Sequence, residues 1–450
     1  MALTGLVTVV LALAALAGGC SKAVPSNTWS LKKSPAGAQL QQFIHEKMMQ
    51  EAVLVEADGK AWNKESVKSE RPACQPFFAA AARGDWPAAS KFYADLKARV
   101  ERSQTNPNPT VPRGMWWQTV NETYYAMDQL VNGNEKYAVA FAHDIISSIP
   151  PGSIYLGGTD PGRFMVTALM ESQAEGKPFF VLTQNALADG TYLDYVQAMY
   201  GKQIQTLTRE DEQKCFQEYI EDARQRLKAG QLKPGEDVKV EQTGRVAVSG
   251  RVAVMSINAR LVKTLFDNNP NREFYLEESW PLDWMHPNLE PHGLIFKINR
   301  QPLASLSSEQ VQQDHDYWTQ YITPMIGNWL GDDTPVRDVT DFATKVFLQH
   351  DFSGFQGDPG FVRDPYSSKS FSKLRSSQAD MYVWRMNHAG GEAERERMAR
   401  AADLAFRQAL ALCPYLPEAV PGYEDFLKSR NRTADAALVA ECAAQFKGWK

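Results

Sequence analysis

Apolar and polar positions change in blocks through residues 154–185, and these blocks predict a strand, a turn, a helix and a second strand. The apolar run 154–156 leads into Gly157-Gly158-Thr159-Asp160-Pro161-Gly162, and a helix-like segment follows at 164–174. The next apolar run, 179–182, ends in Thr183-Gln184-Asn185. A helix between two strands implies a parallel pair with a right-handed crossover. Ligands of open α/β sheets bind outside the carboxyl ends of the strands, so the polar residues after each run mark the expected site.

The same kind of pattern continues to about residue 300 and predicts an α/β domain over 151–302. Further strands are expected at 274–277 and 294–298, with helices at 192–200, 210–229 and 255–266. Residues 230–254 alternate and carry glycines, which favours a hairpin or an extended excursion. The fold class is therefore α/β, with a mostly parallel sheet of four or more strands.

Helical periodicity flanks this domain on both sides. We expect a tether and first helix over 21–72, a helical region over 73–150 and another over 303–450. Residues 392–446 resemble tetratricopeptide-type helical hairpins, with small and apolar residues spaced to interlock. Only about one and a half such repeats are visible, whereas free-standing arrays need about three or more. We therefore expect a helical pair that packs on its neighbours.

The first 20 residues carry no charge and are almost entirely apolar up to Ala17-Gly18-Gly19-Cys20. An apolar core of this length that ends in small residues is typical of a secretory signal. A cysteine after two glycines resembles a bacterial lipobox, which predicts lipid attachment at Cys20; the alternative is a truncated transmembrane helix. Ser21 is not the aspartate that commonly retains lipoproteins at the inner membrane. The expectation is a lipid-anchored, periplasm-facing envelope protein, with the outer membrane preferred.

Composition excludes some partners. The chain of 450 residues has a net charge of −5 and no basic run, which argues against nucleic-acid binding. The spacing of Cys74, Cys215, Cys413 and Cys442 fits no metal site, so neither a metal nor a cofactor is predicted. An exported chain would allow three disulfide pairings of these cysteines, and buried thiols are the open alternative.

Four segments of the chain form a recognisable combination: "SIPPGSIYLGGTDPGRF", "FFVLTQNALADGTYLDYVQAMYG", "FYLEESWPLDWMHPNLEPHGLIFKINR" and "KSFSKLRSSQADMYVWR". Together they resemble the extramembrane part of a poorly characterised family of large bacterial membrane proteins. That family is glycosyltransferase-like and distantly similar to protein O-mannosyltransferases. The resemblance implies work on glycans or lipid-linked sugars, with a membrane glycosyltransferase as a partner. In such transferases the catalytic acid lies between membrane helices, which this chain lacks beyond residue 20, so no catalytic residue is carried over.

Two groups of residues at the first two strand ends are the leading ligand-binding candidates. Gly158 lets backbone N–H groups approach a ligand, Asp160 would accept sugar hydroxyls, and Arg163 would hold a phosphate or carboxylate. The alternative is a tight turn in which Asp160 caps the helix and pairs with Arg163. Asn185 and Asp189 follow the second strand and suit hydroxyl recognition. The alternative for Asp189 is a helix N-cap.

Carboxylates and tryptophans follow the third strand, in "EESWPLDW". Glu278 and Asp283, beside Trp280 and Trp284, suit a sugar that stacks on aromatic rings and donates to carboxylates. A carboxylate pair with Glu277 would alternatively perform glycosidase-type acid–base work. The remaining alternative places the tryptophans in the core and the glutamates at a solvated edge.

Other candidates have simpler interpretations. His286 and His292 fit turns, and His315 fits an exposed helix face, because their spacing matches no metal pattern. The loop 351–358 lacks the closing glutamate of a calcium loop. The cations Lys373, Arg375 and Arg385 would meet phosphates or acidic lipid heads, or simply form a solvated face over a core that holds Tyr382 and Trp384.

Three functional hypotheses follow. The first is an accessory or binding module for glycans or lipid-linked sugars, anchored in the envelope. The second is a protein-interaction scaffold that uses the C-terminal helices. The third is an enzyme of glycosyl transfer or hydrolysis, in which one carboxylate among Asp160, Glu277, Glu278 and Asp283 would be needed for turnover.

Overall fold

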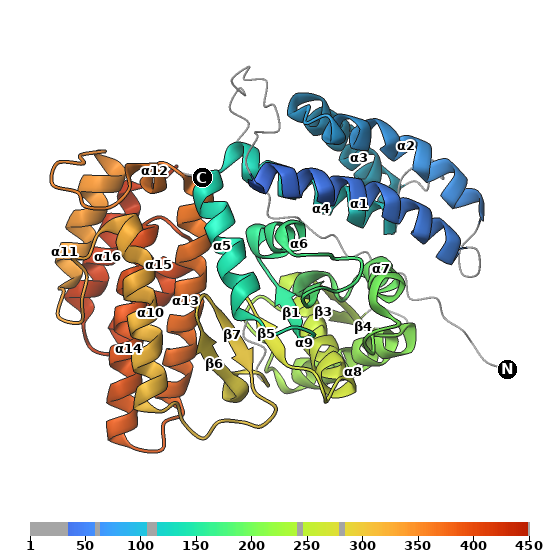
Figure 1. Cartoon of the computed structure of the whole chain (residues 1–450). Coiled ribbons are helices and arrows are strands. Elements are labelled where there is room, and N and C mark those ends of the chain that lie inside the picture. The colour runs from blue at the N-terminus through green and yellow to red at the C-terminus, as the bar shows by residue number, and fades with distance from the viewer. Residues whose placement is uncertain (1–34, 59–63, 106–114, 241–245, 279–283, 449–450) are drawn as a thin grey trace.

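The N-terminal helices pack as one group beside the sheet. The computed structural model describes residues 35–58, 64–105, 115–240, 246–278 and 284–448. Figure 1 shows α1 to α4 on one side of the sheet, and α5 between α6 and α13. These helices are α1 (Pro35–Asp58), α2 (Lys64–Ala82), α3 (Trp86–Thr105), α4 (Met115–Asn132) and α5 (Glu135–Ser148). Within the predicted helical region over 73–150, α2 and α3 are joined by a turn at Gly84, which has a φ of 67°.

Five strands form a mixed sheet in the order β2-β1-β5-β7-β6. They are β1 (Ile154–Gly157), β2 (Phe180–Thr183), β5 (Phe274–Leu276), β6 (Leu289–His292) and β7 (Ile295–Ile298). Both neighbours of β1 are parallel to it, as the crossover pattern predicts. The β5–β7 and β6–β7 pairings are antiparallel, so a mostly parallel sheet is not confirmed.

The unexpected strand is β6, which joins β7 through a tight turn. Gly293 has a φ of 60° there, a conformation that suits glycine at a hairpin. Pro291 and His292 interrupt the apolar alternation of this strand, which hides it in the sequence. Strand β7 therefore runs in the opposite direction to β5, and no helix lies between β6 and β7.

The connections within the α/β region combine short and long helices. The expected helix at 164–174 is a π-helix followed by a single α-turn, and it ends at Leu169. The expected hairpin in 230–254 is present, because β3 pairs antiparallel with β4 in a separate two-stranded sheet. The elements are η1 (Pro161–Met165), α6 (Val166–Leu169), η2 (Gln184–Ala186), α7 (Gly190–Tyr200), α8 (Arg209–Ala229), β3 (Asp237–Val240), β4 (Val246–Ser249), α9 (Arg251–Asn268) and η3 (His286–Asn288).

The C-terminal region is a helical group in which α13 and α14 lie side by side along their length (Figure 1). Because α14 packs chiefly against α13, which precedes residues 392–446, the tetratricopeptide-like arrangement is not confirmed. The elements are α10 (Ser308–Ile326), α11 (Val336–Phe342), η4 (Ala343–Leu348), α12 (Pro359–Val362), α13 (Pro365–Asn387), α14 (Glu392–Leu412), α15 (Ala419–Ser429) and α16 (Thr433–Gln445).

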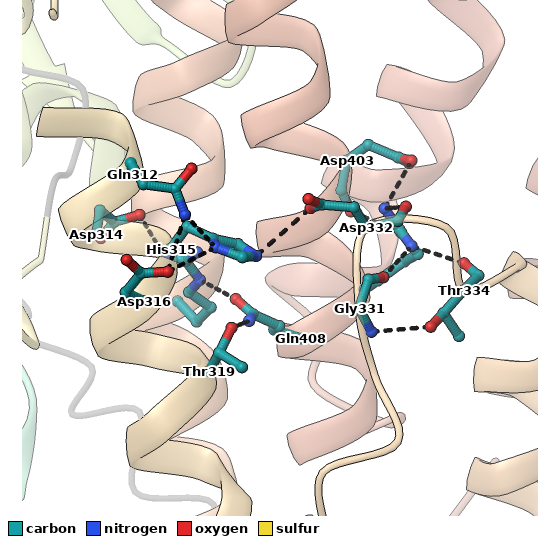
Figure 2. A network of polar contacts seen from close by, with 12 residues as sticks. Gln312, Asp314, His315, Asp316, Thr319, Gly331, Asp332, Thr334, Asp403 and Gln408 are labelled. Carbon is teal, nitrogen blue, oxygen red and sulfur yellow. Dashed lines mark hydrogen bonds and ion pairs between the residues drawn. The ribbon is translucent and has the colours of Figure 1, made fainter. Parts of the chain in front are cut away.

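Polar contacts tie α10 to α14 and to the loop between α10 and α11 (Figure 2). His315 faces Asp332 across this junction, with its Nε2 3.5 Å from the carboxylate, and its side chain is only 24 % exposed. The expectation of an exposed histidine is therefore wrong, because the loop folds back over the helix. Arg407 on α14 donates to the backbone oxygens of Gly331, Asp332 and Thr334. This arginine fixes the loop by satisfying carbonyls that have no helix partner.

One continuous hydrophobic cluster runs from Ala36 in α1 through the sheet to Val439 in α16. Among the described residues, Cys74, Cys215, Cys413 and Cys442 are buried thiols and form no disulfide with one another, in line with the second alternative for them. No helix in the described part of the chain is both long and apolar enough to cross a membrane.

Candidate functional site

Three parallel strands end at the same level of the sheet. Gly157 is in register with Thr183, and Leu156 is in register with Leu276. Gly158, Gln184 and Glu278 are therefore the residues one step beyond this level, at the carboxyl ends of β1, β2 and β5. The carboxyl ends of adjacent parallel strands are where α/β folds place ligands, and we call these three residues and their neighbours the strand-end site.

The turn after β1 closes around the side chain of Glu277. The Gly158 and Thr159 N–H groups donate to Glu277 Oε2 at 2.5 and 2.8 Å, and the Thr159 hydroxyl donates to Oε1. A methyl group on Gly162 would overlap this carboxyl group, so glycine is needed there for space. The N–H groups that we expected to face a ligand are thus occupied by a carboxylate of the chain itself.

Glu277 and Glu278 have different surroundings although they are adjacent in sequence. Both side chains are buried. Burial raises the pKa of Glu277 to about 7, the neighbouring charge of Glu278 adds to this rise, and the bonds from the β1 turn oppose it. Glu278 Oε2 instead forms an ion pair with Lys373 on α13 at 2.9 Å. Burial lowers the pKa of Lys373, but the Glu278 carboxylate outweighs this effect and the pKa lies above its ordinary value.

Several buried polar atoms at the strand ends have no hydrogen-bond partner within the described structure. Both side-chain atoms of Gln184 are in this state, and Gln184 is fully buried. The second carboxylate oxygen of Glu278 and the side-chain oxygen of Asn185 also have no hydrogen-bond partner there. Leaving a buried polar group unsatisfied costs about 1–3 kcal/mol, and such groups are rare in native proteins. These four atoms therefore have hydrogen-bonding capacity that no described residue uses.

The remaining candidates divide between the rim of this edge and structural roles. Asp160 pairs with Arg163 at 2.6 Å, as the tight-turn alternative describes, although its side chain does not cap the helix. Arg163 lies over the Phe164 ring, and its buried Nε has no hydrogen-bond partner in the described structure. Asp189 accepts from the Thr191 N–H at 2.9 Å and is the N-cap of α7. Asp283 lies outside the described residues, as does Cys20.

The structure adds Gln184 to the candidates and gives Lys373 a partner that the sequence did not predict. Gln184 stands in the Thr183-Gln184-Asn185 stretch after the second strand, and no pattern in the sequence distinguishes it from Asn185. Lys373 was grouped with outward-facing cations on α13. That interpretation is wrong for Arg375 and Arg385, which are buried and bind Asp314 and the backbone oxygen of Leu289 respectively.

The histidines and the acidic loop have structural partners. His292 contacts the Ser148 backbone oxygen at 2.8 Å, and the His286 ring stacks on Trp384. Asp351 accepts from the Ser353 N–H at 2.9 Å. In the part of the chain that the structure describes, no three His, Cys, Asp or Glu side chains gather as a metal site would require.

No protein-family model, curated protein or solved structure matches this chain.

Proposed function

We propose that the chain is a binding module for an uncharged, hydroxyl-rich ligand of the glycan class, held at the strand-end site. The observation that carries this proposal is the fully buried amide of Gln184, which lacks hydrogen-bond partners in the described structure, level with the similarly placed oxygen of Glu278. Two polar side chains at one sheet edge, each with free hydrogen-bonding capacity, favour a ligand over a purely structural role.

The chemistry of the free atoms fits hydroxyl groups. A hydroxyl donates one hydrogen bond and accepts others. Glu278, Gln184 and Asn185 supply acceptor oxygens, and the Gln184 amide nitrogen supplies a donor. Anionic ligands suit this place less, because Glu277 fills the N–H groups of the β1 turn and Lys373 is already paired with Glu278. Neutral glycans are therefore favoured over nucleotide sugars and polyprenyl phosphates.

Ligand entry requires local opening, since Gln184 and Glu278 are buried. Binding sites often lie in segments whose opening free energy is well below that of global unfolding. Asp160 has a side chain that is 43 % exposed, and Arg163 and Lys373 are about a quarter exposed, so these residues form the accessible rim. We expect a ligand to reach the buried amide past this rim.

The enzymatic hypothesis has weaker support. Glu278 is already paired with Lys373. Glu277 is also held by three donors from the β1 turn. A carboxylate fixed in this way is poorly placed to exchange protons with a substrate.

A thermal-shift panel on the full chain tests the proposal. Short neutral glycans, nucleotide sugars and a polyprenyl phosphate analogue would be compared at equal ionic strength. A ligand that binds only the native state raises the melting temperature. The proposal predicts a rise with one or more neutral glycans. A rise only with the anionic compounds, or with none of them, would contradict it, and the second result would favour the scaffold hypothesis.

We also propose that the module is attached to the cell envelope through lipid on Cys20. The support is the uncharged apolar segment before this cysteine and the small residues that flank it. Expression in a bacterium, followed by detergent phase partition and mass spectrometry of the N-terminal peptide, tests the attachment. The wild-type chain should carry lipid, and the Cys20→Ser variant should not. A wild-type peptide without lipid would contradict the proposal.

A further inference from the structure

The hairpin of β3 and β4 forms a two-stranded sheet that does not join the main sheet. Strand β4 contacts both α8 and α9, whereas β3 contacts α8 and pairs with β4 along one edge. No strand in the described part of the chain pairs with the outer edge of β3. The backbone N–H and C=O groups of such an edge are a template for pairing with a strand of another chain.

The side chains of β3 form one apolar row and one charged row. Val238 belongs to the hydrophobic core, and Val240 follows it on the same face. Val240 is 54 % exposed, and it is the one exposed large hydrophobic side chain among the described residues. Asp237 and Lys239 lie on the opposite face, with side chains that are 44 % and 74 % exposed. Both rows are therefore accessible from outside the molecule.

The charged row is complementary to itself. An antiparallel pairing of two β3 strands, centred on Val238, places Asp237 of each copy opposite Lys239 of the other copy. Opposite charges that face each other across two strands favour pairing, whereas like charges oppose it. A lysine on an edge strand usually discourages association, but here Asp237 compensates its charge. Within one chain Lys239 Nζ lies 3.3 Å from Asp237 Oδ2, so the strand brings no net charge to the contact.

The apolar row fits the same register. Val238 of one copy lies opposite Val238 of the other, and Val240 is the diagonal neighbour of this pair. Diagonal neighbours across two strands are close enough for side chains to touch. The pairing would thus cover Val240, which the single chain leaves exposed.

We propose that two copies of this chain associate through β3, so that their hairpins form one four-stranded antiparallel sheet with a twofold axis at Val238. The contact is isologous and uses the outer β3 edge of both copies, so it closes at a dimer. Each copy contributes a strand of 4 residues. So short an edge gives a weak dimer, with a dissociation constant on the order of 100 µM.

Sedimentation equilibrium tests the association, with the full-length Cys20→Ser chain as background so that lipid cannot cause it. This chain should dimerise with a dissociation constant of about 100 µM. Lys239→Asp places like charges opposite each other at two points and should weaken dimerisation at least about tenfold. Adding Asp237→Lys exchanges the two charges and should restore the affinity to within about threefold. The control Lys428→Asp makes the same change in net charge at an exposed position on α15, and it should leave dimerisation unchanged.

Cysteine crosslinking tests the register. Residues directly opposite each other in an antiparallel pair have Cβ atoms about 5 Å apart, which is close enough for a disulfide to form with little movement. Asp237→Cys combined with Lys239→Cys should therefore give a covalent dimer under mild oxidation. Lys239→Cys alone should give much less, because the two copies of residue 239 are offset along the paired strands.

A chain that remains monomeric up to about 500 µM would overturn the proposal, and this result needs no variant to fold. Dimerisation that a folded Lys239→Asp chain retains in full would place the interface elsewhere and overturn it too. So would a loss that the charge exchange does not restore in a folded chain. Assemblies that grow beyond a dimer would contradict an isologous contact.

Discussion

Glu277 determines the conformation of the turn that follows β1. Its carboxylate accepts from Gly158 and Thr159, and Gly162 leaves room for it. These partners lie 119 and 118 residues away along the chain. A glycine-rich turn looks the same in sequence whether a ligand or a distant side chain fills it. The sequence could therefore locate the turn and its glycines, but not the group that the turn surrounds.

A methyl group at Gly162 should destabilise the protein through Glu277. Gly162→Ala would push the carboxyl group away from the donors of the turn, and we expect the free energy of unfolding to fall by about 2–4 kcal/mol. Urea unfolding measures the change. Gly331→Ala is the matched control, since no atom lies within 4 Å of an added methyl group there. Equal effects of the two substitutions would show that Glu277 does not occupy this space.

Glu277 should also give stability a particular dependence on pH. Its pKa rises from 4.5 to about 7 on folding, so between these values the native state holds a proton that the unfolded state has released. The contribution of Glu277 to the free energy of unfolding is therefore fully present below pH 4.5, and it falls by about 3 kcal/mol as the pH rises to 7.

Urea unfolding at pH 5, 6, 7 and 8 checks this dependence. In the Glu277→Gln variant, which has no proton to release, stability should decline less over this range. The same slope in both proteins would contradict the raised pKa.

At the scale of elements, hydrophobic periodicity predicts most helices and four of the five strands of the main sheet. It fails where a polar side chain is buried by a partner far away in sequence. Helix α13 is the clearest case, because Arg375 and Gln378 face the interior and bind each other as well as Asp314 and backbone oxygens. Such positions are indistinguishable from a solvated face until the neighbouring helices are placed.

Helix α1 provides the test at this scale, since a buried lysine holds it against the α/β region. Lys47 is fully buried and contacts Glu122 on α4, Gln173 and the Tyr195 hydroxyl, the last at 2.7 Å. Burial lowers the pKa of this lysine, although Glu122 opposes that effect. An ammonium group in this setting is stable only while its partners remain.

Lys47→Met should leave Glu122 buried without its counter-charge and reduce stability by about 3–5 kcal/mol. Adding Glu122→Gln should restore most of the loss, because the double variant buries no isolated charge. Thermal unfolding of the two single variants and the double variant measures this coupling. Additive losses would mean that the two side chains do not act as a pair.

At the scale of the whole molecule, the three regions share one hydrophobic cluster, and the strand-end site lies where they meet. The N-terminal helices contact the turn after β1 through α4 and α5, and the C-terminal helices contribute Lys373. The sequence predicts the α/β core and the edge that carries the site. It could not predict that α13 reaches this edge, since that contact depends on how the regions pack.

The central claim is that the buried amide of Gln184 binds a neutral glycan. Calorimetry with the glycan of largest thermal shift tests it most directly, comparing the wild type, Gln184→Leu and the control Gln313→Leu at an exposed position on α10. Gln184→Leu removes an unsatisfied buried amide, so it should raise stability by about 1 kcal/mol while weakening affinity at least about tenfold. The control should change neither. Full affinity in a folded Gln184→Leu chain would contradict the account.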